Sequence, residues 1–288
     1  MKKFINNPEL VKQLSWLILP LVFAWLATNY LWYSIRGQRP VWEAQGEGLS
    51  VETEEVAPYL REFEKVNNLG SEGLVTFWFD DAWKSQYLIG HEVLKKYGFT
   101  GAVAVPTDMV GYPAYMDWRQ IRDLQENGWE ITNHSASHAD DFNNWKFEDV
   151  YKDFSKSQKI LWKQRVTSDH FVAPLGRVSE GTRKAAEMRF KSLRTVDWGV
   201  NKLPLTDPYN ILAVNLDHKV TADDIKPYLD EAKKNRGWLI ITFHQLGKGD
   251  EGGVDVLYPY KYSENDMDEI VRAVKDSGLR VVVPSQII

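Results

Sequence analysis

The stretch TFWFDDAW, Thr76 to Trp83, joins an apolar aromatic run to two adjacent carboxylates, Asp80 and Asp81. The run that precedes them, LVTFWF at 74–79, has the composition of a buried β-strand, so the aspartates stand at a strand end. Adjacent like charges repel, and a buried carboxylate without a partner is costly. We therefore expect a cation close to this strand end.

Strand-like and helix-like segments alternate from Gly73 to the end of the chain. The pattern predicts strands at 74–79, 100–105, 129–132, 170–175, 193–198, 211–216, 238–243 and 280–283. Between most of them it predicts helices, at 85–98, 117–128, 147–164, 180–190, 222–235 and 263–278. Repeated βα units are typical of a parallel sheet covered by helices. Seven or eight strands in this length favour an α/β barrel, complete or incomplete, over an open sheet.

Composition excludes several kinds of site. The chain has 288 residues, a net charge of −5 and no basic stripe, so nucleic acid is not an expected partner. It has no cysteine, which excludes cysteine zinc sites, thiol nucleophiles and disulfides. A hydrophobic fraction of 43% is enough for a sizeable core.

The N-terminal region differs from the rest of the chain. Residues 14–35 carry no charge, and a helix of that length spans roughly 33 Å, about one hydrocarbon core. We expect a retained single-pass membrane anchor rather than a cleaved signal peptide or a core helix. A slight excess of basic residues before the anchor places the remaining chain outside the cytoplasm. The expected organisation is a tail at 1–13, the anchor at 14–35, a linker at 36–72 and one catalytic domain at 73–288.

Chemically active side chains follow the ends of several predicted strands. In parallel α/β folds these ends meet on one rim, and the rim here is expected to hold Asp80, Asp81, His134, His138, Asp197 and His244. Two histidines and one carboxylate bind Zn²⁺ or a similar divalent ion and leave positions open for water and substrate. The H-x-x-x-H spacing alone fits two solvated histidines equally well. Its place beside strand-end carboxylates favours a metal, and the metal is the expected cation.

Five short motifs carry a family resemblance. The sequences TFWFDDA, HSASH, VAPLG, DW and TFH occur in the order of the T-F-D-D-G, H-[ST]-x-x-H, R-x-P-[FY]-G, D-W and L-x-H motifs of polysaccharide deacetylases. From Gly73 to Ile288 the chain resembles this carbohydrate esterase 4, NodB-homology family. The resemblance implies a distorted (β/α)₇ barrel that removes N-acetyl groups, sometimes O-acetyl groups, from a glycan. It also implies a divalent metal, with Zn first and Co, Ni, Mn or Fe as alternatives.

The resemblance assigns roles to the motif residues. Asp80 matches the general base, and Asp81, His134 and His138 match the metal ligands.

Further roles follow from the later motifs. His244 matches the general acid, Asp197 the acid that tunes it, and the backbone N–H of Leu175 the oxyanion donor. The residues alone leave two alternatives open, a core histidine for His244 and a surface acid for Asp197. Trp198 either walls an acetyl pocket or packs in the core.

The chain departs from the family pattern in its third motif. Val172 replaces the arginine that steadies the general base, and Arg177 or Arg194 is a candidate substitute. The other departures are Leu175 for an aromatic residue, Ala82 for glycine and Thr242 for leucine.

These patterns predict a membrane-anchored, metal-dependent deacetylase of an N-acetylglucosamine-containing glycan, acting in the cell envelope. Two alternatives stay open. One is a carbohydrate-binding pseudoenzyme, which the missing arginine favours, and the other is a metal-dependent amidase for a small non-sugar substrate. The aromatic and acidic loop at 247–262 is expected to border either a long groove or a small pocket. The sequence does not indicate an oligomeric state.

Overall fold

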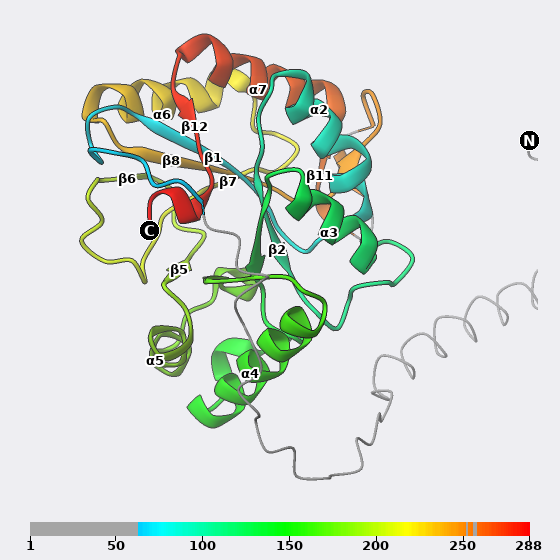
Figure 1. Cartoon of the computed structure of the whole chain (residues 1–288). Coiled ribbons are helices and arrows are strands. Elements are labelled where there is room, and N and C mark those ends of the chain that lie inside the picture. Colours follow the sequence, from blue (N-terminus) through cyan, green and yellow to red (C-terminus); the bar gives the residue numbers. More distant parts are fainter. Residues whose placement is uncertain (1–62, 252, 256–257) are drawn as a thin grey trace, which may run out of the picture. The chain divides into compact units, whose positions relative to one another are not determined.

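The computed structural model describes residues 63–251, 253–255 and 258–288 (Figure 1). Contacts divide the chain into Met1–Glu54 and Glu55–Ile288, and all described residues belong to the second unit. The predicted anchor at 14–35 and the first part of the predicted linker lie outside the described residues. Within the described ranges, no helix has the length and apolar character needed to span a membrane.

A curled, mostly parallel sheet forms the centre of this unit. Its main path in the described residues runs through β5 (Ser192–Arg194), β4 (His170–Val172), β3 (Glu130–Asn133), β2 (Ala102–Val105), β1 (Leu74–Phe79), β8 (Trp238–Phe243) and β6 (Val200–Asn201). Two short strands, β12 (Arg280–Val281) and β7 (Val214–Asn215), pair with β1 and β8. Strand β6 is antiparallel to β8, whereas the other pairs are parallel. The predicted helix-covered parallel sheet is thus confirmed.

The outer edge of β5 does not end the sheet. Ile211 accepts a backbone hydrogen bond from Thr195 at 2.9 Å and donates one to Leu193 at 3.1 Å. A few residues later the same segment becomes β7, which pairs with β8. The segment therefore links the two ends of the curled sheet. Strands β4, β5 and β7 are shorter than predicted. The chain leaves the sheet early after β4 and β5, whereas β7 begins later than predicted.

Helices cover the sheet on its outer side. They are α2 (His91–Lys96), which continues a single π turn η1 (Gln86–Gly90), and α3 (Trp118–Glu126), α4 (Phe147–Lys163), α5 (Glu180–Arg189), α6 (Ala222–Asn235) and α7 (Glu264–Ser277). Figure 1 shows α6 and α7 side by side, with α4 and α5 together at the opposite end. Side chains that accept hydrogen bonds from the first turn cap four of these helices, namely Asp117, Ser179, Thr221 and Ser263.

Three 3₁₀ turns complete the main body: η2 (Phe142–Asn144), η3 (Pro174–Gly176) and η4 (Pro284–Gln286). The segment predicted as a loop at 247–262 instead contributes to a small second sheet. This sheet contains β9 (Leu246–Gly247), β10 (Gly253–Asp255) and β11 (Tyr258–Ser263).

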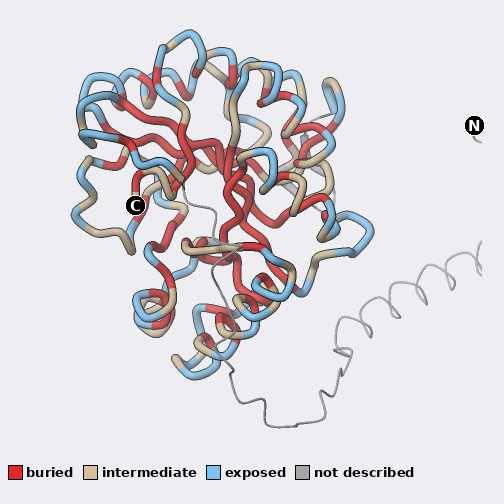
Figure 2. Tube along the Cα trace, viewed as in Figure 1, coloured by how far each residue is buried: buried red, intermediate tan, exposed pale blue. Residues whose placement is uncertain are grey.

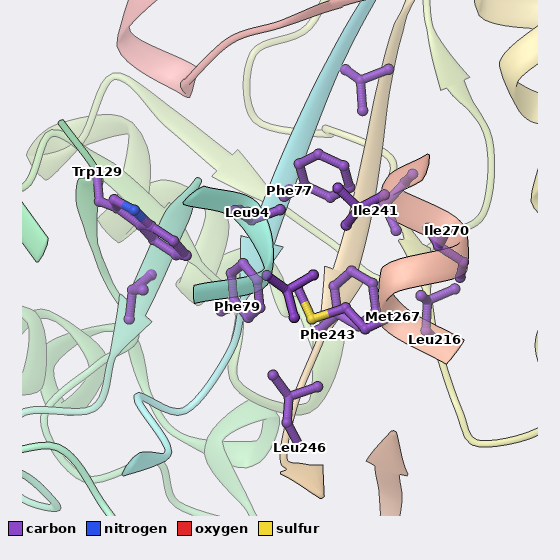
Figure 3. Packing of buried hydrophobic residues seen from close by; sticks show 14 of the residues in the cluster. Phe77, Phe79, Leu94, Trp129, Leu216, Ile241, Phe243, Leu246, Met267 and Ile270 are labelled. Atoms are coloured by element: carbon purple, nitrogen blue, oxygen red, sulfur yellow. The ribbon is translucent and has the colours of Figure 1, made fainter. Parts of the chain in front are cut away.

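The strands alternate between two buried layers. In β1, Val75, Phe77 and Phe79 belong to the large outer cluster beneath the helices, and Leu74 and Trp78 belong to an inner cluster. Figure 2 shows the central strands buried along their length, and Figure 3 shows the outer cluster. The next residue on the inner side of β1 is Asp80, because side chains alternate along a strand. The same alternation in β8 puts Thr242 and His244 on the side of Trp238 and Ile240.

A buried polar cluster lies at the amino ends of β3, β4 and β5. Glu130 accepts hydrogen bonds from the backbone N–H and the hydroxyl of Ser285, each at 2.7 Å. His170 lies 3.0 Å from the Ser285 hydroxyl and 2.8 Å from the Ser192 hydroxyl. Burial raises the pKa of Glu130 to about 7 and lowers the pKa of His170 to about 3. The cluster joins η4 to the sheet, far along the strands from Asp80.

These two groups make opposite contributions to the pH dependence of stability. Unfolding returns the raised Glu130 pKa to 4.5, so that contribution is lost as the pH rises from 4.5 towards 7. Unfolding returns the lowered His170 pKa to 6.5, so its contribution is lost as the pH falls from 6.5 towards 3. Each contribution changes the free energy of unfolding by about 1.4 kcal/mol per pH unit. Where the two pH ranges overlap, the two changes offset one another.

We expect the Glu130→Gln variant to show the His170 slope alone. Its free energy of unfolding, measured by urea titration, should fall steadily between pH 6.5 and pH 4.5 relative to the wild type. Parallel stability curves for the two proteins across that range would contradict this assignment.

Candidate active site

Strand pairing brings Asp80 and His244 to the same place. The backbone N–H of Asp80 donates to the carbonyl of Phe243 at 2.9 Å, across the β1–β8 pair. The side-chain amide of Gln86, in η1, donates to the carbonyl oxygens of Asp80 and His244, the latter at 3.1 Å. Gln86 is fully buried. One amide group therefore holds the carboxyl ends of β1 and β8 together.

Asp81, His134 and His138 converge on a single point. Asp81 Oδ1 lies 3.3 Å from His134 Nε2 and 3.2 Å from His138 Nε2. One ligand atom from each residue lies within 4.8 Å of the others. Asp81 and His134 are buried, and the side chain of His138 is 14% exposed. The three predicted metal ligands are thus brought together, and His138 is the one that is partly exposed.

The donor atoms of this set fit a metal ion. His134 Nδ1 lies 2.8 Å from the carbonyl oxygen of Val172, which accepts only from a protonated Nδ1. In the neutral ring the Nε2 lone pair then faces Asp81 Oδ1, another lone-pair atom. Two such atoms at this distance repel unless a proton or a cation lies between them. A second hydrogen bond that fixes the tautomer is the usual arrangement of a metal-binding histidine.

The turn between the two histidines is held from α4. Both oxygens of the Asp153 carboxylate accept backbone hydrogen bonds, from Ala136 at 2.6 Å and Ser137 at 3.1 Å. The Ser135 hydroxyl accepts another from the backbone of His138 at 2.9 Å. Ser135 and His138 both have positive φ, at 63° and 47°. Polar contacts therefore stabilise a left-handed backbone that orients the imidazoles.

Residues with positive φ are concentrated in the segments that carry Asp81 and the two histidines. Among the described residues other than glycine, eight have positive φ. Five of them lie in the site segments: Asp81, Ala82, Ser135, His138 and Leu175. Ala82 stands where the family motif has glycine, and its φ of 55° is a conformation that glycine adopts more readily. The departure at Ala82 therefore preserves the turn at some cost in strain.

Asp80 has a different partner from Asp81. Its Oδ2 accepts a hydrogen bond from Arg194 Nη2, and both side chains are almost completely buried. Arg194 Nη1 also donates to the Thr195 carbonyl and the Thr242 hydroxyl, each at 3.2 Å. Asp80 Oδ1 is buried and accepts no hydrogen bond within the described residues. A guanidinium thus fixes one oxygen of Asp80 and leaves the other available.

Sheet register explains how Arg194 occupies this position. Val172 in β4 and Arg194 in β5 are direct partners in the parallel pair. Both belong to the inner side, where Val172 packs in the cluster of Trp78 and Arg194 lies 5.2 Å from the Trp78 ring. The arginine missing at Val172 is therefore replaced by one on the neighbouring strand. Arg177, the other candidate, donates instead to the carbonyl of Asp140.

His244 lies beside Asp80 rather than in the ligand set. Its Nε2 is 3.9 Å from Asp80 Oδ2, and its side chain is 13% exposed. Burial lowers the pKa of His244, although the charges of Asp81 and Asp80 act in the opposite direction. The side chain therefore reaches the site from β8 next to the carboxylate that Arg194 holds.

Asp197 does not occupy the predicted position beside His244. It is exposed, and within the described part of the chain no hydrogen bond or ion pair joins its carboxylate to His244. The backbone of Asp197 is held in place, because its carbonyl oxygen accepts a hydrogen bond from the backbone N–H of Ala213 at 2.9 Å. This bond holds the chain after β5 with the carboxylate in solvent. In the structure, His244 is influenced by the Asp80–Asp81 pair and not by Asp197.

The remaining two predicted residues border the site region from loops. Leu175, in η3, is 45% exposed and has a φ of 55°. Trp198 is 47% exposed, and its ring contacts Tyr228 of α6 edge-on at 5.9 Å. Trp198 therefore does not pack in the core.

Sequence reasoning missed three residues that position the site: Gln86, Asp153 and Trp83, whose indole donates to Asp81 at 2.9 Å. Gln86 and Asp153 act through contacts with other segments of the chain, and the motifs carry no signal for them. Trp83 could have been found from the sequence, because it lies two residues after Asp81 in the quoted stretch TFWFDDAW.

The sequence model of the family described as polysaccharide deacetylase matches residues 68–189. Over these residues the chain resembles the polysaccharide deacetylase family. The matched segment includes Asp80, Asp81, His134 and His138 and ends before Arg194 and His244.

Solved structures of deacetylases share the fold. The CE4 domain of a xylanase from the hindgut metagenome of Trinervitermes trinervoides is 13% identical, with a TM-score of 0.52, over 75% of this chain and 89% of that one. A peptidoglycan N-acetylglucosamine deacetylase is 17% identical, with a TM-score of 0.53, over 76% and 89%. A mutant CE4 pseudoenzyme with restored activity is 16% identical, with a TM-score of 0.51, over 76% and 68%.

At these identities the likeness concerns the fold. The chain spans only 63%, 50% and 50% of three further deacetylase structures. No curated protein sequence matches the chain.

The register of β4 and β5 leads to an exchange experiment. Arg194→Val leaves a buried carboxylate without its cation, so we expect deacetylase activity to be lost and stability to fall by about 3–5 kcal/mol. Val172 and Arg194 are direct partners on one face of the sheet. Adding Val172→Arg to the Arg194→Val variant should therefore restore part of the activity and part of the stability. Metal affinity should stay close to that of the wild type in both variants.

Activity is measured by acetate release and stability by urea titration. An active Arg194→Val single variant would contradict the role given to Arg194.

Proposed function

We propose that this protein is a metal-dependent hydrolase that removes N-acetyl groups from an N-acetylglucosamine-containing polysaccharide. The main support is the separation of the two adjacent carboxylates. Asp81 faces two imidazoles, whereas Asp80 is held by Arg194 and keeps one oxygen available. Metal-assisted hydrolysis of an amide combines a Lewis acid with a base, and this pair would supply a place for each.

Asp81, His134 and His138 would hold the divalent metal, with zinc the first candidate. Nitrogen and oxygen donors in a set of three are typical of catalytic zinc sites. A metal bound here polarises the substrate carbonyl and makes a nearby water more acidic. The Val172 carbonyl keeps the His134 ring in the tautomer that such binding requires.

Asp80 would act as the general base. Its Oδ1 is the atom available to take a proton from the attacking water, because Oδ2 is occupied by Arg194. The guanidinium fixes the plane of the carboxylate.

In its protonated form, which the charges of Asp81 and Asp80 favour and burial opposes, His244 would donate a proton to the departing nitrogen. It lies next to Asp80 and outside the ligand set, and its backbone, directly after β8, is held by Gln86. The backbone N–H of Leu175 would donate to the oxyanion, and the exposed ring of Trp198 would contact the sugar. Asp197 has no part in this mechanism, because its carboxylate lies in solvent.

The alternative of a binding pseudoenzyme loses its main argument. That reading rested on the arginine missing at Val172, and Arg194 supplies an equivalent guanidinium from β5. We further propose that the curled sheet is an incomplete (β/α)₇ barrel within a catalytic domain at 73–288. Residues 14–35 would anchor it to the membrane, with 36–72 as the linker and the domain outside the cytoplasm.

The two carboxylates should respond differently to the same substitution. Asp81→Asn should lose metal and activity together, because a neutral amide is a weaker ligand for a divalent cation. Asp80→Asn should retain metal but lose about 10²–10⁴-fold in rate, the usual loss for a general base. Asp108→Asn, which removes a carboxylate paired with Lys156 on the surface, is the matched control.

Acetate release from N-acetylglucosamine oligomers, with and without a chelator, measures the rate, and elemental analysis measures the metal. Chelator-insensitive release would reject the metal site. Equal metal loss in both variants would reject the division of roles. Acetate release by Asp80→Asn at the wild-type rate would reject Asp80 as the base.

A further inference from the structure

Trp83 contacts the carboxylate of Asp81 from the side opposite the histidines. Its indole Nε1–H donates to Asp81 Oδ2 at 2.9 Å. The other oxygen, Oδ1, is the one that faces His134 and His138. The two oxygens of Asp81 thus have different partners: Oδ2 accepts the indole hydrogen bond, and Oδ1 faces the imidazoles. A carboxylate held in this way presents one defined oxygen to the imidazoles.

Trp83 is itself held by the loop between β2 and α3. Its ring stacks on Tyr115 with centroids 4.5 Å apart and an interplanar angle of 22°. The two residues also form an antiparallel backbone bridge. Hydrogen bonds on either side of it, from Lys84 to Ala114 and from Met116 to Ala82, are each 2.8 Å long. The loop therefore fixes the position of the indole.

Burial alone does not account for this arrangement. Trp83 is only partly buried and belongs to none of the hydrophobic clusters of the described residues. Asp81 has a φ of 77°, which sets the direction in which its side chain leaves the backbone. A directed hydrogen bond to one oxygen removes the remaining rotational freedom. Such outer contacts tune the affinity of a metal site.

We infer that Trp83 is a positioning residue that selects the oxygen of Asp81 presented to the metal, and that Tyr115 holds Trp83 in place. The inference rests on the proposed metal site. It makes the β2–α3 loop part of the metal-binding structure, although the loop contributes no ligand.

The test is the zinc affinity of the apo protein, measured by competition with a chromophoric chelator. Trp83→Phe keeps an aromatic ring against Tyr115 but removes the N–H. We expect its zinc dissociation constant to rise about 10–100-fold, the usual effect of losing an outer-shell partner. Tyr115→Leu keeps the indole but removes the stacked ring, and we expect a smaller rise. The melting temperature of each apo variant reports whether it folds.

Trp145→Phe is the matched control, because Trp145 donates an indole N–H to Asp141 at 3.0 Å away from the ligands. Its zinc affinity should equal that of the wild type. Unchanged affinity in a folded Trp83→Phe, or an equal loss in Trp145→Phe, would overturn the inference. If Trp83→Phe does not fold, unchanged affinity in Tyr115→Leu overturns it. A wild type that binds no zinc would instead reject the metal site itself.

Discussion

Two neighbouring buried carboxylates must each be neutralised by a separate cation, and the architecture of the site follows from this constraint. Asp80 continues the inner face of β1 and meets the guanidinium of Arg194. Asp81 turns away through a positive φ and meets two imidazoles. Because the chain reverses its backbone handedness between them, two adjacent residues point at different partners. The like-charge repulsion of the pair is thereby offset within a largely buried environment.

The curled sheet supplies those partners from distant parts of the sequence. Strands β3 and β4 bring the His134 segment and the carbonyl that orients it, and β5 brings Arg194. Strand β8 adds His244 next to β1, and Gln86 ties those two strand ends together. Polar groups outside the motifs, above all Asp153 and Trp83, then hold the strained turns. The reactive residues depend on this supporting set for their geometry.

Much of the fold and part of the site were predictable, because they depend on local sequence patterns. The apolar run before Asp80 predicted β1. The family motifs and their places at strand ends predicted that Asp81, His134 and His138 come together, as the structure shows. Arg194 could only be named as one of two candidates, because the register between β4 and β5 is a tertiary property. The exposure of Asp197 could not be predicted, because it depends on a loop hydrogen bond to Ala213. The contacts of Gln86 and Asp153 join segments far apart in sequence, and no local pattern records them.

The division between Asp80 and Asp81 is tested most directly by diffraction at the zinc edge from crystals grown with zinc. We predict one anomalous peak for zinc in the described domain. It should lie about 2.0–2.2 Å from Asp81 Oδ1, His134 Nε2 and His138 Nε2. Asp80 should remain bonded to Arg194 and outside ligand distance. A zinc ion bound to Asp80, or shared between both aspartates, would contradict it.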